Sequence, residues 1–265
     1  MPLANLQDRH LSHLARSTNA QTTSTLIDID LGTLRDIRVM AILRHNLSLD
    51  ATVRVTAYSD AGRSQLVDGS DTGALQVWLP FYPSGSLPWG HPDLWEGKIN
   101  IEDRDGYQFD FIRAYSASVV ARYWRVEIVD TANPDGYVEL GRCILAPAWE
   151  PSINISYGFS FGYDSDATVN RTVGGRRIIE ENVKWRTATC AIDKLPDGEA
   201  AACVFDIQRR LSKVGEIIFI FDPDDDSQAM WQRSFLANLE DLDRITLAGY
   251  DANTVGFRFI EVEGQ

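Results

Sequence analysis

Hydrophobic and polar residues alternate with period two over much of the first half of the chain. This alternation is typical of β-strands with one buried face. It predicts strands over 26–31, 37–41, 52–58, 119–130 and 137–145. Gly32 ends the first strand, and turn-forming residues at 45–50 and 133–136 separate others. The first half is therefore predicted to be rich in β-structure.

The second half begins with clean alternation over 153–163. Gly174 and Gly175 then predict a turn, and 177–192 is interpreted as one or two further strands. Two more strands are expected at 246–250 and 255–262. No internal repeat is present.

One segment has helical spacing, near Gly198–Val214. Asp197 suits the N-cap and Gly215 the position just beyond the C-terminus. The apolar positions with helical spacing are Ala200, Val204, Ile207, Leu211 and Val214. The apolar run 216–222 follows directly and predicts a strand buried on both faces.

The segment 78–98 contains four prolines, which exclude a central strand or a helix. We interpret it as a long ordered loop whose aromatic rings contact other subunits. The interface candidates in this loop are Trp78, Phe81, Tyr82, Trp89 and Trp95. Packing within the loop, or a platform for stacking sugars, are the alternatives. Pro147 and Pro151 bracket Trp149 and predict a boundary between domains 1–147 and 148–265.

The chain has 265 residues and a formal net charge of −13. This charge argues against a nucleic-acid surface and against binding to an anionic membrane. No run of about 18 apolar residues predicts a membrane-spanning helix, and the first residues lack the apolar core of a signal peptide. Arginine outnumbers lysine by 21 to 4, which suits protein interfaces but is equally explained by a GC-rich genome. The three cysteines are expected to be free thiols.

No catalytic residue, cofactor site or metal site is predicted. The four histidines lie in polar or proline-rich segments, and no sequence motif of a hydrolase or nucleotide-binding loop occurs. The acidic run 222–226 is interpreted as a solvated loop rather than a calcium site, because it lacks the EF-hand glycine and distal glutamate. Glu180 and Glu181 are likewise interpreted as surface charges. Arg176 and Arg177 are expected to be exposed beside a hairpin turn, where they contact acidic neighbouring subunits.

Two segments resemble the discoidin-like, galactose-binding jelly roll found in phage tail proteins. The first is Ile27-Asp28-Ile29-Asp30-Leu31-Gly32 with the strands that follow it. The second is Arg122-Tyr123-Trp124-Arg125-Val126-Glu127-Ile128, followed by 133–142. The second half is similar to phage minor tail and distal-tail proteins in the succession 207–223 and the ending 257–261.

The resemblance implies a mainly β protein. Its parts would be an N-terminal β-sandwich and a C-terminal β-rich α+β domain with one main helix. It also implies a virion component of the tail tip or baseplate, assembled in the bacterial cytoplasm, and no enzyme. The implied partners are hub, tube or fibre proteins, with further copies in a homo-oligomeric ring. The main alternative is a carbohydrate-binding module for host surface glycans, and a hydrolase accessory domain is a third hypothesis.

Overall fold

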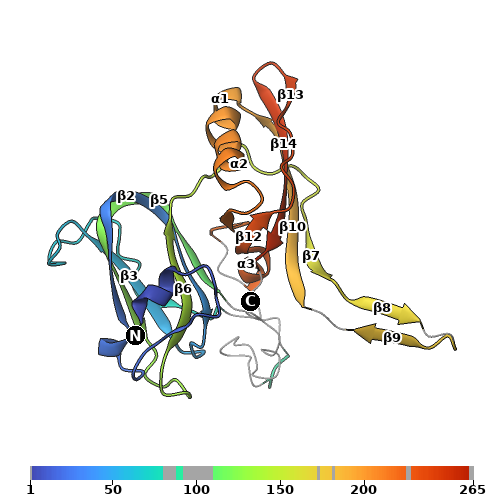
Figure 1. Cartoon of the computed structure of the whole chain (residues 1–265). Coiled ribbons are helices and arrows are strands. Elements are labelled where there is room, and N and C mark those ends of the chain that lie inside the picture. The colour runs from blue at the N-terminus through green and yellow to red at the C-terminus, as the bar shows by residue number, and fades with distance from the viewer. Residues whose placement is uncertain are drawn as a thin grey trace. The chain divides into compact units, whose positions relative to one another are not determined.

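The computed structural model describes residues 2–79, 88–91, 110–171, 174–180, 183–224 and 228–262. Within these residues the chain forms two compact units (Figure 1). Unit 1 comprises 1–148 and 222–232, and unit 2 comprises 149–221 and 233–263. The structure is mainly β, as the sequence predicts.

Unit 1 is built on one antiparallel six-stranded sheet with the order β1-β6-β2-β5-β3-β4. Its strands are β1 (Ala15–Arg16), β2 (Leu26–His45), β3 (Thr52–Tyr58), β4 (Leu75–Gln76), β5 (Phe111–Val129) and β6 (Glu139–Ala146). Two short 3-10 helices, Leu3–Gln7 and Thr22–Ser24, precede β2. Helix α3 (Gln228–Arg233) also contributes to this unit, although it lies far along the chain.

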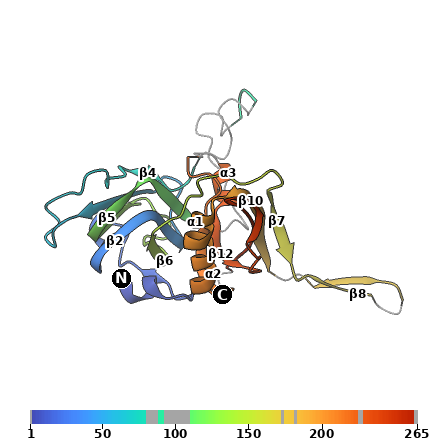
Figure 2. The same cartoon turned by 90° about the horizontal axis from the view of Figure 1, so that it is seen from above.

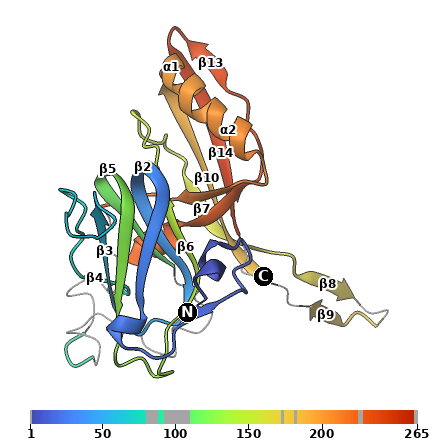
Figure 3. The same ribbon diagram turned by 60° about the vertical axis from the view of Figure 1, so that its left-hand side comes forward.

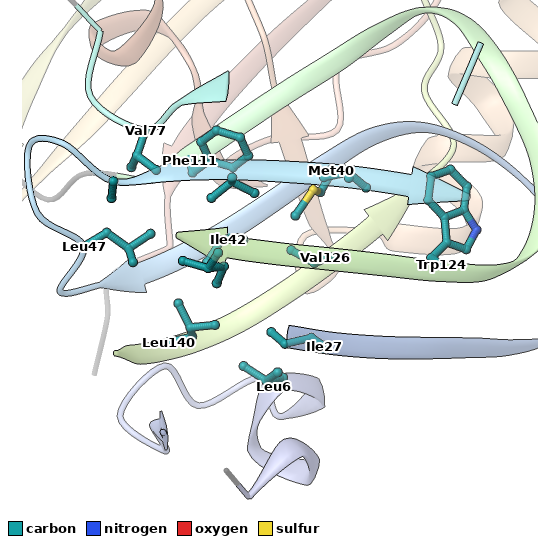
Figure 4. Packing of buried hydrophobic residues seen from close by; sticks show 14 of the residues in the cluster. Leu6, Ile27, Met40, Ile42, Leu47, Val77, Phe111, Trp124, Val126 and Leu140 are labelled. Carbon is teal, nitrogen blue, oxygen red and sulfur yellow. The ribbon is translucent and has the colours of Figure 1, made fainter. Parts of the chain in front are cut away.

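Strands β2 and β5 pair over almost their whole length and are interrupted by two register shifts. These irregularities let a long strand bend from one layer to another. The first half of β2 carries Ile27 and the second half carries Ile42, yet both side chains belong to one core cluster (Figure 4). Gly32, expected to end a strand, instead lies within β2 at a φ of 74°. Two predicted strands are therefore one bent strand.

The core of unit 1 lies between the layers of this bent sheet. Trp124 is fully buried there. Met230 of α3 is buried in the same cluster, and the Arg113 guanidinium donates to its sulfur at 3.1 Å. The sequence pattern predicts no helix at 228–233. A segment from the second half of the sequence therefore completes the first core.

Unit 2 contains a six-stranded sheet in which five strands have the order β11-β12-β14-β10-β7 and the sixth, β13, pairs with β14. Its strands are β7 (Ser160–Ser165), β10 (Lys184–Leu195), β11 (Glu216–Phe219), β12 (Phe235–Leu239), β13 (Thr246–Gly249) and β14 (Ala252–Glu261). A separate two-stranded ribbon is formed by β8 (Thr168–Arg171) and β9 (Arg177–Glu180). The predicted strand over 153–163 is much shorter than expected, since β7 begins only at Ser160.

The predicted helix is present and packs on the sheet near β10 and β14 (Figure 3). It consists of α1 (Asp197–Glu199), a π-helical turn (Ala200–Val204) and α2 (Phe205–Leu211). Ala200 and Val204 are buried in the core of unit 2. The N-cap is Pro196 rather than Asp197, and the helix ends at Ser212 with a φ of 52°.

The helix is shorter than its apolar spacing suggests. Val214 lies beyond its end and is 74% exposed. Gly215 follows, and its amide donates to the Leu211 carbonyl at 2.7 Å. A Cβ at this position would overlap Leu211, so close approach rather than a positive φ requires glycine here.

The expectation that 216–222 forms a strand buried on both faces is wrong. Strand β11 is the edge of the sheet and pairs only with β12 among the described residues. Its side chains are half-buried. A continuous apolar run is typical of a central strand, but only the long-range pairing decides which strand lies at the edge.

Candidate interaction surface

The ribbon of β8 and β9 is an extension of the hairpin between β7 and β10. The chain leaves the sheet after Ser165, runs along β8, turns, and returns through β9 to β10 (Figure 2). Gly175 has a φ of 82°, which confirms the turn predicted at 174–175. The ribbon pairs only with itself in the described part of the chain.

Every described side chain of the ribbon is exposed. Val169, Ile178 and Ile179 are 45%, 46% and 54% exposed, although β-branched apolar residues normally cover a core. A sheet gains stability by burying one face, and a lone two-stranded ribbon is marginally stable in water. The ribbon therefore presents apolar surface that nothing in the described part of the chain covers.

Two of the ribbon's arginines lie directly opposite each other. Arg171 pairs with Arg177 across the strands, on the same face as the pair of Val169 and Ile179 two positions away. Like charges directly opposite each other in a sheet are destabilising. The predicted candidates Arg176 and Arg177 thus lie at the turn end of the ribbon, both exposed. Arg171 was missed, although a turn centred on Gly174 places it opposite Arg177.

Aromatic rings anchor the ribbon's root in unit 2. Phe161 on β7 stacks on Phe159, whose ring lies 4.4 Å from that of Phe221. The Arg233 guanidinium lies over the rings of Phe161 and Phe221, at 5.0 and 5.1 Å from their centroids. Tyr163, next along the same face of β7, is 65% exposed. The edge strand at the root is therefore held by stacking and cation–π contacts.

A buried ion pair fixes the strand to which the ribbon returns. Arg186 of β10 lies opposite Tyr163 of β7 and is 8% exposed. One oxygen of Glu261 on β14 accepts the Arg186 backbone amide at 2.8 Å, and the other accepts its Nε–H at 2.9 Å. The Arg186 guanidinium also stacks on Phe235. Contacts within unit 2 thus hold the root in place, whereas β8 and β9 pair only with each other among the described residues.

The aromatic loop is divided between core and surface. Trp78 is only 6% exposed, and its indole N–H donates to the Leu47 carbonyl at 3.0 Å. This corrects its assignment as an interface residue: an indole that is buried and hydrogen-bonded inside unit 1 serves the core. Trp89 is 87% exposed, so its side chain lies at the surface. Phe81, Tyr82 and Trp95 lie outside the described residues.

Candidate metal ligands do not cluster among the described residues. No group of three His, Cys, Asp or Glu side chains among them is placed to hold a metal ion. Asp224 of the acidic run is exposed, and its amide donates to the Asp222 carboxylate at 3.1 Å. Asp225, Asp226 and Glu181 lie outside the described residues. The absence of an enzymatic activity, a metal and a cofactor stays a prediction.

The cysteines are free thiols, as expected. Burial raises the pKa of Cys143 to about 12 and that of Cys190 to about 11. Thiols with such high pKa values are poor nucleophiles, so neither suits covalent catalysis. Among the described residues, no helix is both long and apolar enough to cross a membrane.

Comparisons with known proteins give little guidance. No family model matches the sequence, and no curated protein matches it. One similar solved structure is the CBM32-1 module of a family 31 glycoside hydrolase from Clostridium perfringens. It is 12% identical, covers 54% of this chain and 83% of the module, and has a TM-score of 0.32. A likeness this low carries no argument about function, and the resemblance to phage tail proteins stays a prediction.

Proposed function

We propose that this chain is a structural component of a multi-subunit assembly, and that the ribbon of β8 and β9 is its docking element. The observation that carries the proposal is the exposure of both ribbon faces, including three β-branched apolar side chains. Such a ribbon gains little stability alone. A partner that covers it would bury the apolar surface and add intermolecular contacts to both strands.

At a finer level, we propose a bacteriophage tail tip or baseplate as the assembly. The resemblance of 27–32, 122–128 and 133–142 to jelly rolls of phage tail proteins supports this. In this proposal the chain is made in the bacterial cytoplasm and incorporated into the virion tail. Its partners are further copies in a ring together with hub, tube or fibre proteins, and it has no enzymatic activity.

Removal of the ribbon tests the proposal. Residues 166–183 are replaced by an Asn-Gly turn that joins Ser165 directly to Lys184, the last cross-strand pair of β7 and β10. We expect the shortened chain to fold, because the cores of both units are left intact. It should be depleted from purified tails, as measured by quantitative mass spectrometry of particles from complemented cells.

A matched control removes exposed apolar side chains elsewhere in unit 2. Leu247 and Tyr250 near β13 are 68% and 102% exposed, so Leu247→Ser with Tyr250→Ser removes comparable surface without touching the ribbon. This control should enter particles at the wild-type level. Incorporation of the ribbonless chain at the wild-type level would refute the docking role.

A carbohydrate-binding module is the second candidate, because Trp89 presents a ring that is 87% exposed. Exposed aromatic faces stack on sugars as readily as they contact proteins. The similar Clostridium perfringens module is a carbohydrate-binding module by name, but the likeness is too low to support the candidate. Trp89→Ala separates the two: loss of glycan-array binding with normal incorporation into particles favours the module.

A further inference from the structure

We infer that one face of the ribbon docks onto an acidic surface of a second copy of this chain. This inference rests on the proposed function of the ribbon as a docking element. It goes further, because it names the face, the partner and the kind of contact. We call this face the arginine face; it consists of Val169, Ile179, Arg171 and Arg177.

The register of β8 and β9 defines the arginine face. Directly opposed residues share a face, and successive pairs alternate between faces. The pair Val169 and Ile179 therefore lies on the same side as the pair Arg171 and Arg177. The opposite side carries the pair Thr168 and Glu180 and the pair Asn170 and Ile178. One side thus combines two apolar residues with two positive charges.

Several other arginines at the surface have carboxylate partners, although Arg9, Arg35 and Arg244 are exposed and form no ion pair among the described residues. Arg122 binds Asp30 at 2.6 Å, and Arg125 binds Asp28 at 2.8 Å. Arg210 on α2 binds Asp206 at 2.6 Å.

In contrast, no carboxylate among the described residues forms an ion pair with Arg171 or Arg177. Their mutual repulsion is therefore not offset within the described part of the chain. An anionic partner surface would remove that repulsion and form bidentate contacts with both guanidinium groups.

The charge of the chain points to a second copy as the partner. Residues 167–179 contain three arginines and no acidic residue, whereas the whole chain has a net charge of −13. The rest of the molecule is therefore more acidic still, and a second copy offers this complementary surface. We infer a heterologous contact, in which the ribbon of each copy docks on the next copy in one direction. Repeated contacts of this kind close into a ring or continue as a filament.

Sedimentation velocity of the purified full-length chain tests the inference. We expect concentration-dependent oligomers at about 0.1 M NaCl and dissociation at about 1 M, because salt screens interactions between charges. Arg171→Gln with Arg177→Gln should weaken self-association by about tenfold or more, since close charge pairs across interfaces contribute at least that much. Far-ultraviolet circular dichroism confirms that the variant is folded.

The control lies on the other face of the same strand. Asn170→Glu changes the net charge by the same amount as Arg171→Gln, but next to the arginine face rather than on it. We expect Asn170→Glu to self-associate like the wild type and Arg171→Gln to do so less tightly. If both variants weaken self-association equally, net charge alone is responsible, and the proposal that the arginine face forms the contact is overturned.

Mixing the double variant with the wild type tests the heterologous geometry. The variant lacks the docking face but keeps the acidic surface, so it should cap growing oligomers and shift them to smaller species. Unchanged wild-type oligomers in the mixture would contradict this arrangement.

Different results would refute the second copy as the partner and the ribbon as a docking element. A wild-type chain that is monomeric at every concentration overturns the second copy as partner. If that chain still enters particles only when its ribbon is present, the docking role stands and the partner is a different protein. If particle entry does not depend on the ribbon either, the proposed function is refuted as well.

Discussion

Loss of the charge on Glu261 should destabilise unit 2 strongly. The Arg186 and Glu261 side chains are only 10% and 11% exposed, and the carboxylate accepts both the backbone amide and the guanidinium of Arg186. Glu261→Gln keeps the size and shape but removes the carboxylate charge that faces the buried guanidinium of Arg186. Breaking a buried pair in this way costs about 3–5 kcal/mol of unfolding free energy.

The residual exposure of both side chains places the expected loss at the lower end, about 3 kcal/mol. For a unit of roughly 100 residues, this corresponds to a fall of roughly 12–24 °C in Tm. Hydrogen exchange followed peptide by peptide on β10 and β14 separates unit 2 from unit 1. Differential scanning calorimetry then gives the change in Tm.

Two further variants show whether loss of this ion pair causes the expected fall in the free energy of unfolding. Arg186→Met with Glu261→Met should recover most of the lost stability, because replacing a whole buried pair by apolar residues is often neutral. Asp241→Asn breaks the exposed pair with Lys213, whose side chains are 53% and 49% exposed, and should have a much smaller effect. The reasoning fails if Glu261→Gln is no more destabilising than Asp241→Asn.

Two more predictions concern unit 1. Trp78→Ala should lower the free energy of unfolding by about 3–5 kcal/mol in urea titrations, whereas Trp89→Ala should change it by no more than about 0.5 kcal/mol; equal effects would contradict the separation of core from surface. The hydrogen bond from Arg54, followed by that from the Gly73 amide, lowers the pKa of Asp71 to about 2. Because its pKa is lower in the folded state, the stability from Asp71 is present above the ordinary carboxyl pKa and is lost as pH falls through about 2. NMR titration should show that Arg54→Gln raises the pKa of Asp71, and an unchanged pKa would disprove the cause.

Local patterns in the sequence determined the class of the fold and several of its elements. Period-two alternation predicted the β-rich architecture, and helical spacing located the segment that begins at Asp197. Gly174 and Gly175 predicted the turn of the ribbon. These features depend on residues a few positions apart, so the backbone geometry of a single element is enough to predict them.

The places of several elements in the fold depended on contacts between residues far apart in the sequence, so local patterns could not predict them. The run at 216–219 became an edge strand, and α3 entered the core of unit 1 from the second half of the chain. Trp78 became a core residue because its indole meets Leu47, 31 residues earlier. An indole ring suits a core and an interface equally well, so composition alone could not show whether Trp78 is a core residue or an interface residue.

The ribbon of β8 and β9 shows the same division between sequence and tertiary structure most clearly. The sequence indicated exposed arginines next to a glycine turn, but not that Arg171 opposes Arg177 on one face with Val169 and Ile179. A shift of one residue in the register would move every side chain to the other face. Only the pairing of the two strands decides which charged and apolar side chains share one face of the ribbon. The direction of these side chains follows from the register and not from sequence spacing alone.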